Sequence, residues 1–234
     1  MGFLSVKCFN LSVDHKEVLE VKILITGFDP FGGESVNPAY EAIKLLPDEI
    51  GGAQIVKMEV PTVFGKAGEA LKAGIEMHQP GAVICVGQAG GRSGMSVEKV
   101  AINFQDARIP DNENQQPIDQ VIEEDGDTAY FATVPVKAMV AKMRENGIPA
   151  FVSYTAGTFV CNELMYALLY LLHKKYPHIR GGFIHVPFAM QQTVEKPNGT
   201  PAMALSSITK GLECSILAVI ENREDISQAM GTTH

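Results

Sequence analysis

The stretch AFVSYTAGTFVCNELMYALLYLL, residues 150–172, shows the pattern of the whole chain most clearly. Its first part, AFVSYT (150–155), is β-rich, and small, flexible residues follow. The apolar run that comes next predicts a helix over 162–176. Strand, turn and helix in this order are the repeating unit of an α/β protein. The turn ends in a single thiol, Cys161, at the mouth of the predicted helix.

The same alternation recurs along the chain. GAVICVG (81–87) is apolar throughout, as expected of a strand in a sheet that is covered on both faces. SVEKVAINFQ (96–105) alternates, which predicts an edge strand. The pattern therefore favours an α/β sandwich with a largely parallel sheet. Further strands are predicted over 21–26, 53–61, 150–155 and 181–187, and helices over 38–47, 66–78, 134–146, 162–176 and 202–220.

Two segments depart from this order. Residues 1–20 lack clear periodicity and the shape of a secretory signal. They are either a genuine extension or upstream sequence that has been read through, in which case the native protein begins near Val21. We expect residues 21–234 to form one catalytic domain. The polar stretch 106–127 is too long for a simple connection, which is typical of a functional or mobile loop.

The composition argues against several classes of partner and site. A net charge of -8 argues against a nucleic-acid or anionic-membrane partner. The 4 cysteines lie far apart with no CxxC pair, so neither a disulfide framework nor a zinc site is expected, and a reducing cytoplasm suits them. No apolar run is long enough to cross a bilayer. The glycine-rich loops GFDPFGG and GQAGGR match no nucleotide fingerprint.

Ligand sites of open α/β sheets form beyond the carboxyl ends of the strands, where Cys161 lies. Unpaired N–H groups and the positive dipole end at a helix start stabilise a thiolate and can hold an oxyanion. Cys161 is therefore a candidate nucleophile with a lowered pKa. The alternative is a buried, inert cysteine.

His185, near the end of the predicted strand 181–187, is a candidate general base, or else a neutral core histidine. Glu98 follows the loop GGRSGMSV and is either the acid that orients the imidazole or a solvated edge charge. Asp29 and Asp111 are competing acids. Phe28 and Phe31 either wall a small apolar pocket or belong to the core.

Several blocks together resemble the pyroglutamyl peptidase I family, also called pyrrolidone carboxyl peptidases. They are ILITGFDPFGG followed by NP, VGQAGGR, VEKVAINFQDARIPDN, AYFATVPVKAMV, TAGTFVCNELMYALL and HVPF. They occur in family order and span roughly residues 21–220. The resemblance implies a three-layer α/β/α sandwich with a mixed, largely parallel, twisted sheet, as in related hydrolases and phosphorylases. It also implies a cytoplasmic homotetramer without metal or cofactor.

The resemblance assigns roles to individual residues. The nucleophile falls on Cys161, the histidine on His185 and the acid on Glu98. Six further positions match the substrate site, namely Phe28, Phe31, Asn37, Gln88, Arg108 and Phe159. The turn GMSVEKV departs from the family's usual Thr-Pro-Glu-Arg version, and residues 1–20 have no counterpart.

The expected activity is removal of an N-terminal pyroglutamyl (5-oxoproline) residue from peptides through a thioester. Three alternatives stay open at this point. The first is an amidase of the glutamine-amidotransferase type, and the second is a phosphorylase-like nucleoside enzyme. The third is a non-catalytic protein that binds pyroglutamyl peptides. Release of ammonia from glutamine, dependence on phosphate, and binding without thiol sensitivity would distinguish them.

Overall fold

The computed structural model describes residues 22–232. Seven strands form the central sheet, in the order β2-β3-β1-β4-β9-β5-β8. Neighbours run parallel except for the pairs β2–β3 and β5–β9, so the sheet is mixed, as predicted. Its strands are β1 (Lys22–Phe28), β2 (Glu49–Ile50), β3 (Ala53–Val60), β4 (Ala82–Gln88), β5 (Met95–Glu98), β8 (Ala150–Ser153) and β9 (Arg180–Val186).

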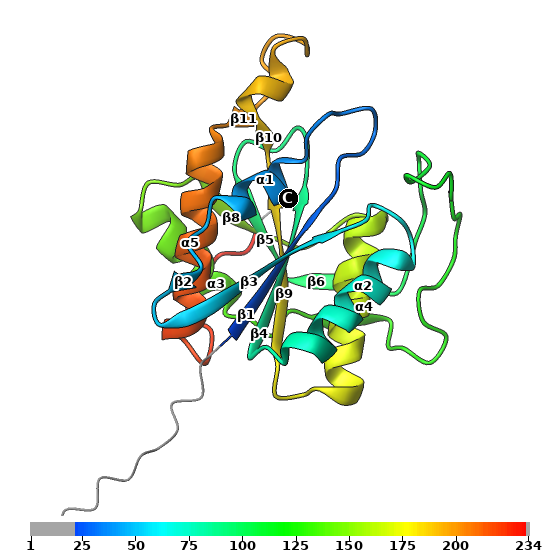
Figure 1. Cartoon of the computed structure of the whole chain (residues 1–234), viewed down its shortest axis with the longest axis horizontal. Coiled ribbons are helices and arrows are strands. Elements are labelled where there is room, and N and C mark those ends of the chain that lie inside the picture. Colours follow the sequence, from blue (N-terminus) through cyan, green and yellow to red (C-terminus); the bar gives the residue numbers. More distant parts are fainter. Residues whose placement is uncertain (1–21, 233–234) are drawn as a thin grey trace, which may run out of the picture.

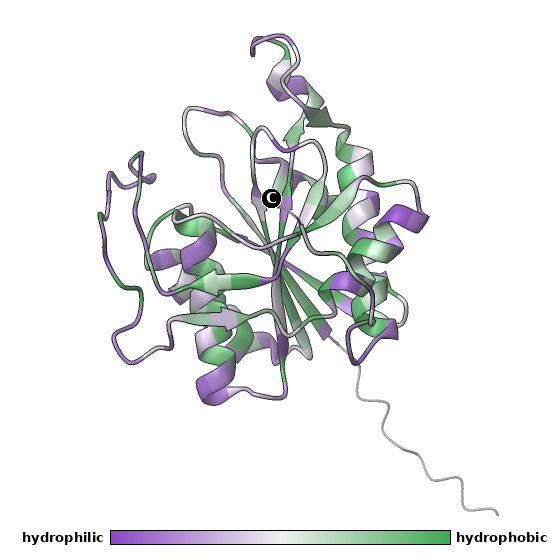
Figure 2. Cartoon of the chain, turned by 180° about the vertical axis from the view of Figure 1, so that it is seen from behind, coloured by the Kyte–Doolittle hydropathy of each residue, from purple (hydrophilic) through white to green (hydrophobic). Residues whose placement is uncertain are grey.

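Helices cover both faces of this sheet, which makes three layers (Figure 1). One face carries α2 (Lys66–His78) and α4 (Val160–Lys175), and the other carries α1 (Pro38–Lys44), α3 (Val136–Glu145) and α5 (Leu205–Glu221). The central strands β1, β4 and β9 are buried over almost their whole length, because both of their faces are covered. Figure 2 shows this apolar centre and the more polar outer loops.

A glycine in β1 sets the distance between the sheet and α1. A Cβ at Gly27 would lie 2.8 Å from backbone atoms of Tyr40. Backbone atoms cannot give way as a flexible side chain does, so only glycine permits this approach. The contact holds α1 close against β1, the strand that precedes it.

The predicted edge strand over 96–105 is wrong. Its first part is β5, which lies inside the sheet between β9 and β8. Its second part is β6 (Val100–Ile102), which leaves the sheet and pairs with β7 (Ala129–Phe131). The polar residues of β5 are buried because they face other polar groups and not solvent, as the site below shows.

Two excursions leave the sandwich. The loop 106–127 contains neither helix nor strand and joins the rest through an isolated bridge between Gln105 and Gln120. The second is an arm made of β10 (Phe188–Ala189), the short helix η1 (Met190–Thr193) and β11 (Ala202–Met203), at the top of Figure 1. No helix within residues 22–232 has the length and apolar character needed to span a membrane. The interpretation of residues 1–20 falls outside the described part of the chain.

Candidate active site

The thiol of Cys161 lies against the sheet at the start of α4. Cys161 is the second residue of that helix and is partly exposed. A Cβ at Gly87 would come within 2.9 Å of its Sγ atom. In the β4–β9 ladder, Gly87 pairs with His185. Thiol and imidazole therefore flank the same glycine, on the face of the sheet that α4 covers.

The imidazole of His185 is held by a carboxylate. Its Nδ1 atom lies 2.7 Å from Oε1 of Glu98. Both side chains are buried, with 3 % of His185 and 0 % of Glu98 exposed. The contact arises because β5 runs antiparallel to β9, so that Ser96 stands opposite His185 and Glu98 opposite Phe183.

Arg92 completes this polar cluster, and the sequence reading did not identify it. Its Nη1 atom donates to Oε1 of Glu98 at 2.6 Å and also to Oγ of Ser96. Its Nη2 atom donates to the carbonyl oxygen of Thr155 at 3.2 Å. Arg92 thus ties the acid to the turn that precedes α4. An arginine in a glycine-rich loop carries no sequence signal that distinguishes this position from an exposed one.

These contacts determine the protonation states of Glu98 and His185. Burial by itself raises the pKa of Glu98, but the hydrogen bond and charge of His185 and the charge of Arg92 prevail, so that the pKa is lowered. Burial lowers the pKa of His185 despite the opposing effect of Glu98. At neutral pH an ionised Glu98 therefore faces a neutral imidazole. The proton of that imidazole is on Nδ1, and Nε2 is free to accept.

The predicted thiolate at Cys161 is wrong for the free protein. Burial, followed by the negative charge of Glu98, raises the pKa of Cys161 to about 12, and the charge of Arg92 offsets this only in part. At neutral pH the adjacent His185 is uncharged and so supplies no positive charge to stabilise a thiolate. Within residues 22–232 no hydrogen bond joins Cys161 to His185. In unliganded enzymes such bonds are often long and tighten only when substrate binds.

The start of α4 offers unpaired donors. The N–H groups of Asn162 and Glu163 both donate to the carbonyl oxygen of Phe159. Those of Val160 and Cys161 have no acceptor among the described residues, and no side chain caps the helix. Free N–H groups next to a nucleophile are the usual means of stabilising an oxyanion.

An aromatic cluster lies beside the thiol. The ring of Phe159 stands 6.3 Å from that of Phe31 and 5.2 Å, edge to face, from that of Phe64. Phe64 was not among the predicted residues. Phe28, in contrast, is only 2 % exposed and packs against Phe183 at 6.4 Å, in the core beneath the site.

The remaining predicted positions differ in their surroundings. Asn37 is buried and caps α1, with its Oδ1 atom accepting from the N–H of Ala39 at 3.1 Å. Gln88 ends β4, and its Oε1 atom accepts from Nε2 of Gln192 in the arm at 2.9 Å. Arg108 is exposed on the loop 106–127.

The two competing acids are engaged elsewhere. Asp29 accepts from the N–H of Thr62 at 2.7 Å. Asp111 is buried and accepts from the N–H of Phe64 at 2.9 Å and from that of Gln115 at 2.8 Å, which fastens the loop 106–127 to the start of α2. Of the three candidate acids, Glu98 alone contacts His185.

The chain is thus an α/β protein that carries a thiol, an imidazole and a carboxylate at one edge of its sheet. These are the groups that thiol-dependent catalysis uses. Comparison with known proteins makes the class specific. The model of the pyroglutamyl peptidase family matches residues 21–222. Pyrrolidone-carboxylate peptidases of Clostridium botulinum and Enterococcus faecalis are both 58% identical to the chain, covering 90% and 92% of it and 99% and 100% of the relatives.

Solved structures agree with this. The pyroglutamyl peptidase I of Bacillus amyloliquefaciens superposes with a TM-score of 0.87 at 48% identity, over 90% of this chain and 100% of that one. The pyrrolidone carboxyl peptidase of Thermococcus litoralis gives 0.85 at 41% identity, over 89% and 99%. The chain belongs to the pyroglutamyl peptidase family. The predicted family and fold class are thereby confirmed.

Proposed function

We propose that this enzyme removes an N-terminal pyroglutamyl residue from peptides, with Cys161 as nucleophile, His185 as general base and acid, and Glu98 as the orienting carboxylate. Membership of the pyroglutamyl peptidase family shows the activity, and the roles of the three residues are the proposal. The observation that carries the assignment of residues is the 2.7 Å contact between His185 and Glu98 beside the glycine that Cys161 touches.

The first half-reaction begins from neutral groups. As Sγ of Cys161 attacks the pyroglutamyl carbonyl carbon, its proton passes to Nε2 of His185, which the ionised Glu98 stabilises as an imidazolium. The carbonyl oxygen becomes an oxyanion, held by the free N–H groups of Val160 and Cys161. When the C–N bond breaks, His185 returns the proton to the leaving amine, and a thioester remains.

Water completes the cycle. His185 takes a proton from a water molecule that attacks the thioester carbon. The C–S bond then breaks, and the proton passes to the sulfur of Cys161. Free 5-oxoproline leaves, and the thiol and the neutral imidazole are restored.

The substrate's cap determines what the pocket needs. A pyroglutamyl ring has no ammonium group, so an apolar slot with a few amide-matching hydrogen bonds suits it. Phe31, Phe64 and Phe159 supply such a wall beside Cys161. We assign the lactam contacts to Asn37 and Gln88 and the positioning of the carbonyl to Arg108. Phe28 supports the pocket from the core beneath it.

Hydrolysis of pyroglutamyl-p-nitroanilide tests the assignment. Cys161→Ala should abolish turnover with an unchanged circular dichroism spectrum, and Cys161→Ser should be nearly inactive, because a hydroxyl needs stronger activation than a thiol. Glu98→Gln should reduce kcat by roughly 10²-fold or more, but less than either change at Cys161. A fully active Cys161→Ala would remove the nucleophile, and a harmless Glu98→Gln would remove the acid.

The same assay separates the alternatives. Release of ammonia from glutamine without cleavage of the pyroglutamyl amide would favour an amidotransferase-type amidase. Phosphate-dependent turnover would favour a phosphorylase. Binding of a pyroglutamyl peptide without cleavage, and without an effect of iodoacetamide, would favour a binding protein.

The organisation of the native protein is part of this proposal. We infer a cytoplasmic homotetramer that acts on pyroglutamyl peptides without a nucleic-acid partner, built from one catalytic domain over residues 21–234 that follows an extension over 1–20. Light scattering coupled to size-exclusion chromatography tests the assembly, and a monomeric mass would contradict it. N-terminal sequencing of native protein tests whether the chain begins at Met1 or near Val21.

A further inference from the structure

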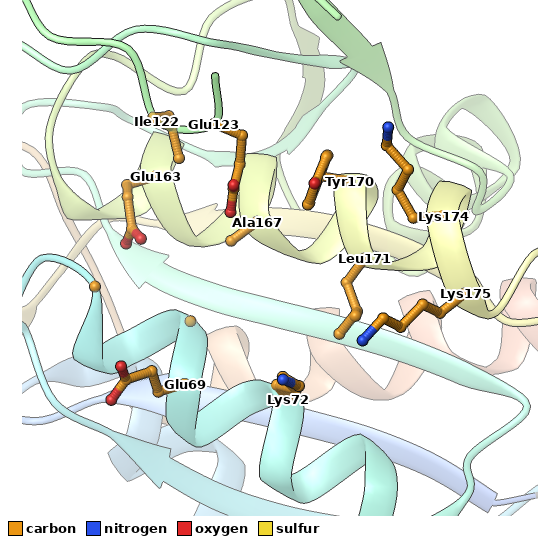
Figure 3. A pocket seen from close by; sticks show the side chains of 12 residues that line it. Glu69, Lys72, Ile122, Glu123, Glu163, Ala167, Tyr170, Leu171, Lys174 and Lys175 are labelled. Carbon is orange, nitrogen blue, oxygen red and sulfur yellow. The ribbon is translucent and has the colours of Figure 1, made fainter. Parts of the chain in front are cut away.

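A groove separates α2 from α4 on the outer side of the helix that carries the thiol (Figure 3). Its volume is about 600 Å³, which is the size of a small-molecule site. The third wall comes from the loop 106–127, through Ile122 and Glu123. Cys161 faces the sheet and Glu163 lines this groove, so the two lie on different sides of α4.

A buried carboxylate without a full set of partners lines the groove. Glu163 is only 5 % exposed, and its Oε2 atom forms no hydrogen bond with any described residue. Gly68 of α2 lies opposite this carboxylate, since a Cβ there would be in ordinary contact with Oε1 of Glu163 at 3.6 Å. A buried charge is costly unless it is paired, so this carboxylate favours a ligand that brings a cationic donor.

The protonation of Glu163 supports this view. Burial raises its pKa to about 7, the charge of Glu123 adds to that, and the backbone of Gly65 opposes it. Glu69 and Lys72 of α2 are two further charged residues that line the groove. Above pH 7 the side chain is therefore an anion that lacks a counter-charge.

The groove has two ends of opposite charge. Figure 3 shows Glu69, Glu123 and Glu163 at the end near the start of α4, whereas Lys175 lies toward the other end, with Lys72 between them on α2. Among residues 22–232, neither Lys72 nor Lys175 takes part in an ion pair. Lys174, also in the lining, is already paired with Asp125 at 3.0 Å.

We propose that this groove binds a short peptide, with the peptide's free N-terminal ammonium group at Glu163 and its C-terminal carboxylate at Lys72 and Lys175. Lys175 follows Glu163 by twelve residues on one helix, which corresponds to about 18 Å. An extended peptide advances about 3.4 Å per residue, so about five residues span that distance. Four are enough where the Lys175 side chain reaches back toward Lys72, as Figure 3 shows. Ala167 and Leu171 provide the apolar floor between the ends.

The link to catalysis rests on the proposed function. The peptide released by removal of a pyroglutamyl cap has a free ammonium terminus, whereas the blocked substrate has none. The groove thus distinguishes product from substrate by the one group that the reaction exposes. Binding itself is independent of turnover and is tested without it.

Isothermal titration of the whole protein with tetraalanine at pH 8 is the direct test. Tetraalanine should bind, whereas N-acetyl-tetraalanine, which lacks the ammonium group, should bind at least about tenfold more weakly. Glu163→Gln should produce the same loss for tetraalanine while hydrolysis of pyroglutamyl-p-nitroanilide continues. In Lys72→Gln/Lys175→Gln the preference for tetraalanine over its C-terminal amide should disappear.

Controls locate the site. Lys210→Gln, on α5 across the sheet, should bind tetraalanine as the unmodified protein does. Binding should also survive alkylation of Cys161 with iodoacetamide. The proposal is overturned if tetraalanine gives no heat, if acetylation or Glu163→Gln leaves binding unchanged, or if alkylation of Cys161 abolishes it. Equal binding of free alanine would overturn the span from Glu163 to Lys175.

Discussion

Arg92 shows how a single residue adjusts a site that it does not enter. Its guanidinium contacts Glu98, and its charge lowers the pKa of Glu98, His185 and Cys161 alike. It therefore keeps the acid ionised and the base neutral. Arg92 acts through these neighbours, which makes it a positioning residue.

The first prediction concerns the acid limb of the pH profile. Because the pKa of His185 is lowered from 6.5, its neutral form persists below that pH, and kcat/KM should stay high there. Arg92→Gln removes a charge that lowers this pKa, so the acid limb should move to higher pH. Rates measured across the acid range check this. Lys99→Gln serves as the control, and an identical shift in it would assign the effect to general surface charge.

The second prediction concerns the resting thiol. With a pKa raised to about 12, only a small fraction of Cys161 is ionised at neutral pH. The rate of alkylation by iodoacetamide should therefore rise about tenfold per pH unit from neutral pH to about pH 10, because the thiolate is the reactive form. Mass spectrometry should find Cys161 modified before Cys85 and Cys214, which are buried. A rate that levels off near pH 7 would show a stable thiolate and contradict the assigned resting state.

The sequence predicts which residues form the site, but it does not predict their charge. The positions of Cys161, His185 and Glu98 were predictable from strand ends and family blocks. The charge of the thiol was not, because a helix start favours a thiolate while burial and the charge of Glu98 disfavour it. Only the packed structure determines which effect prevails.

Among the elements of secondary structure, β4 and α4 are the pair whose contact positions the thiol of Cys161. Gly87 is the point of contact, since a Cβ there would lie 2.9 Å from Sγ of Cys161 and 2.9 Å from Cζ of Phe183. The strand can approach the helix start this closely because the residue has no side chain.

The third prediction follows from that contact. Gly87→Ala should displace the thiol, reduce kcat/KM by at least about tenfold and lower the free energy of unfolding by about 1–3 kcal/mol. Gly181→Ala is the matched control, because its Cβ would meet Leu172 at 2.6 Å, on the same helix but far from the thiol. It should lose stability and keep its activity in the folded protein. Equal losses of activity in both variants would refute a specific role for Gly87.

The misread strand over 96–105 has a physical explanation. Alternating polar residues usually mark a strand with one face in water. In β5 the polar residues Ser96 and Glu98 instead face Arg92 and His185 inside the protein. The alternation is real, but sequence spacing does not distinguish a side chain that faces water from one that faces a buried polar partner.

At the scale of the whole molecule, the buried Glu163 links stability to pH. Its pKa is raised from 4.5 to about 7 in the folded chain, so folding favours the protonated form. This contribution to stability is complete below the unfolded pKa and is lost as the pH rises through about 7. The groove thus makes the free protein less stable at alkaline pH.

The fourth prediction uses this linkage. Glu163→Gln stays neutral at every pH, so it should unfold with a free energy higher than that of the unmodified protein by on the order of 3 kcal/mol at pH 8. The difference should vanish near pH 4. Urea unfolding at both pH values measures it, and Glu69→Gln, a less buried carboxylate of the same groove, should show little change. A constant difference across pH would contradict the raised pKa.

The order of the strands has a consequence for synthesis. β9 lies between β4 and β5, although it follows both by more than eighty residues of chain. A chain still growing on the ribosome lacks this central strand, and with it the imidazole, until residue 186 has left the exit tunnel. Until β9 pairs with both neighbours, the growing chain lacks the group proposed as general base, so the proposed reaction requires this strand to be in place.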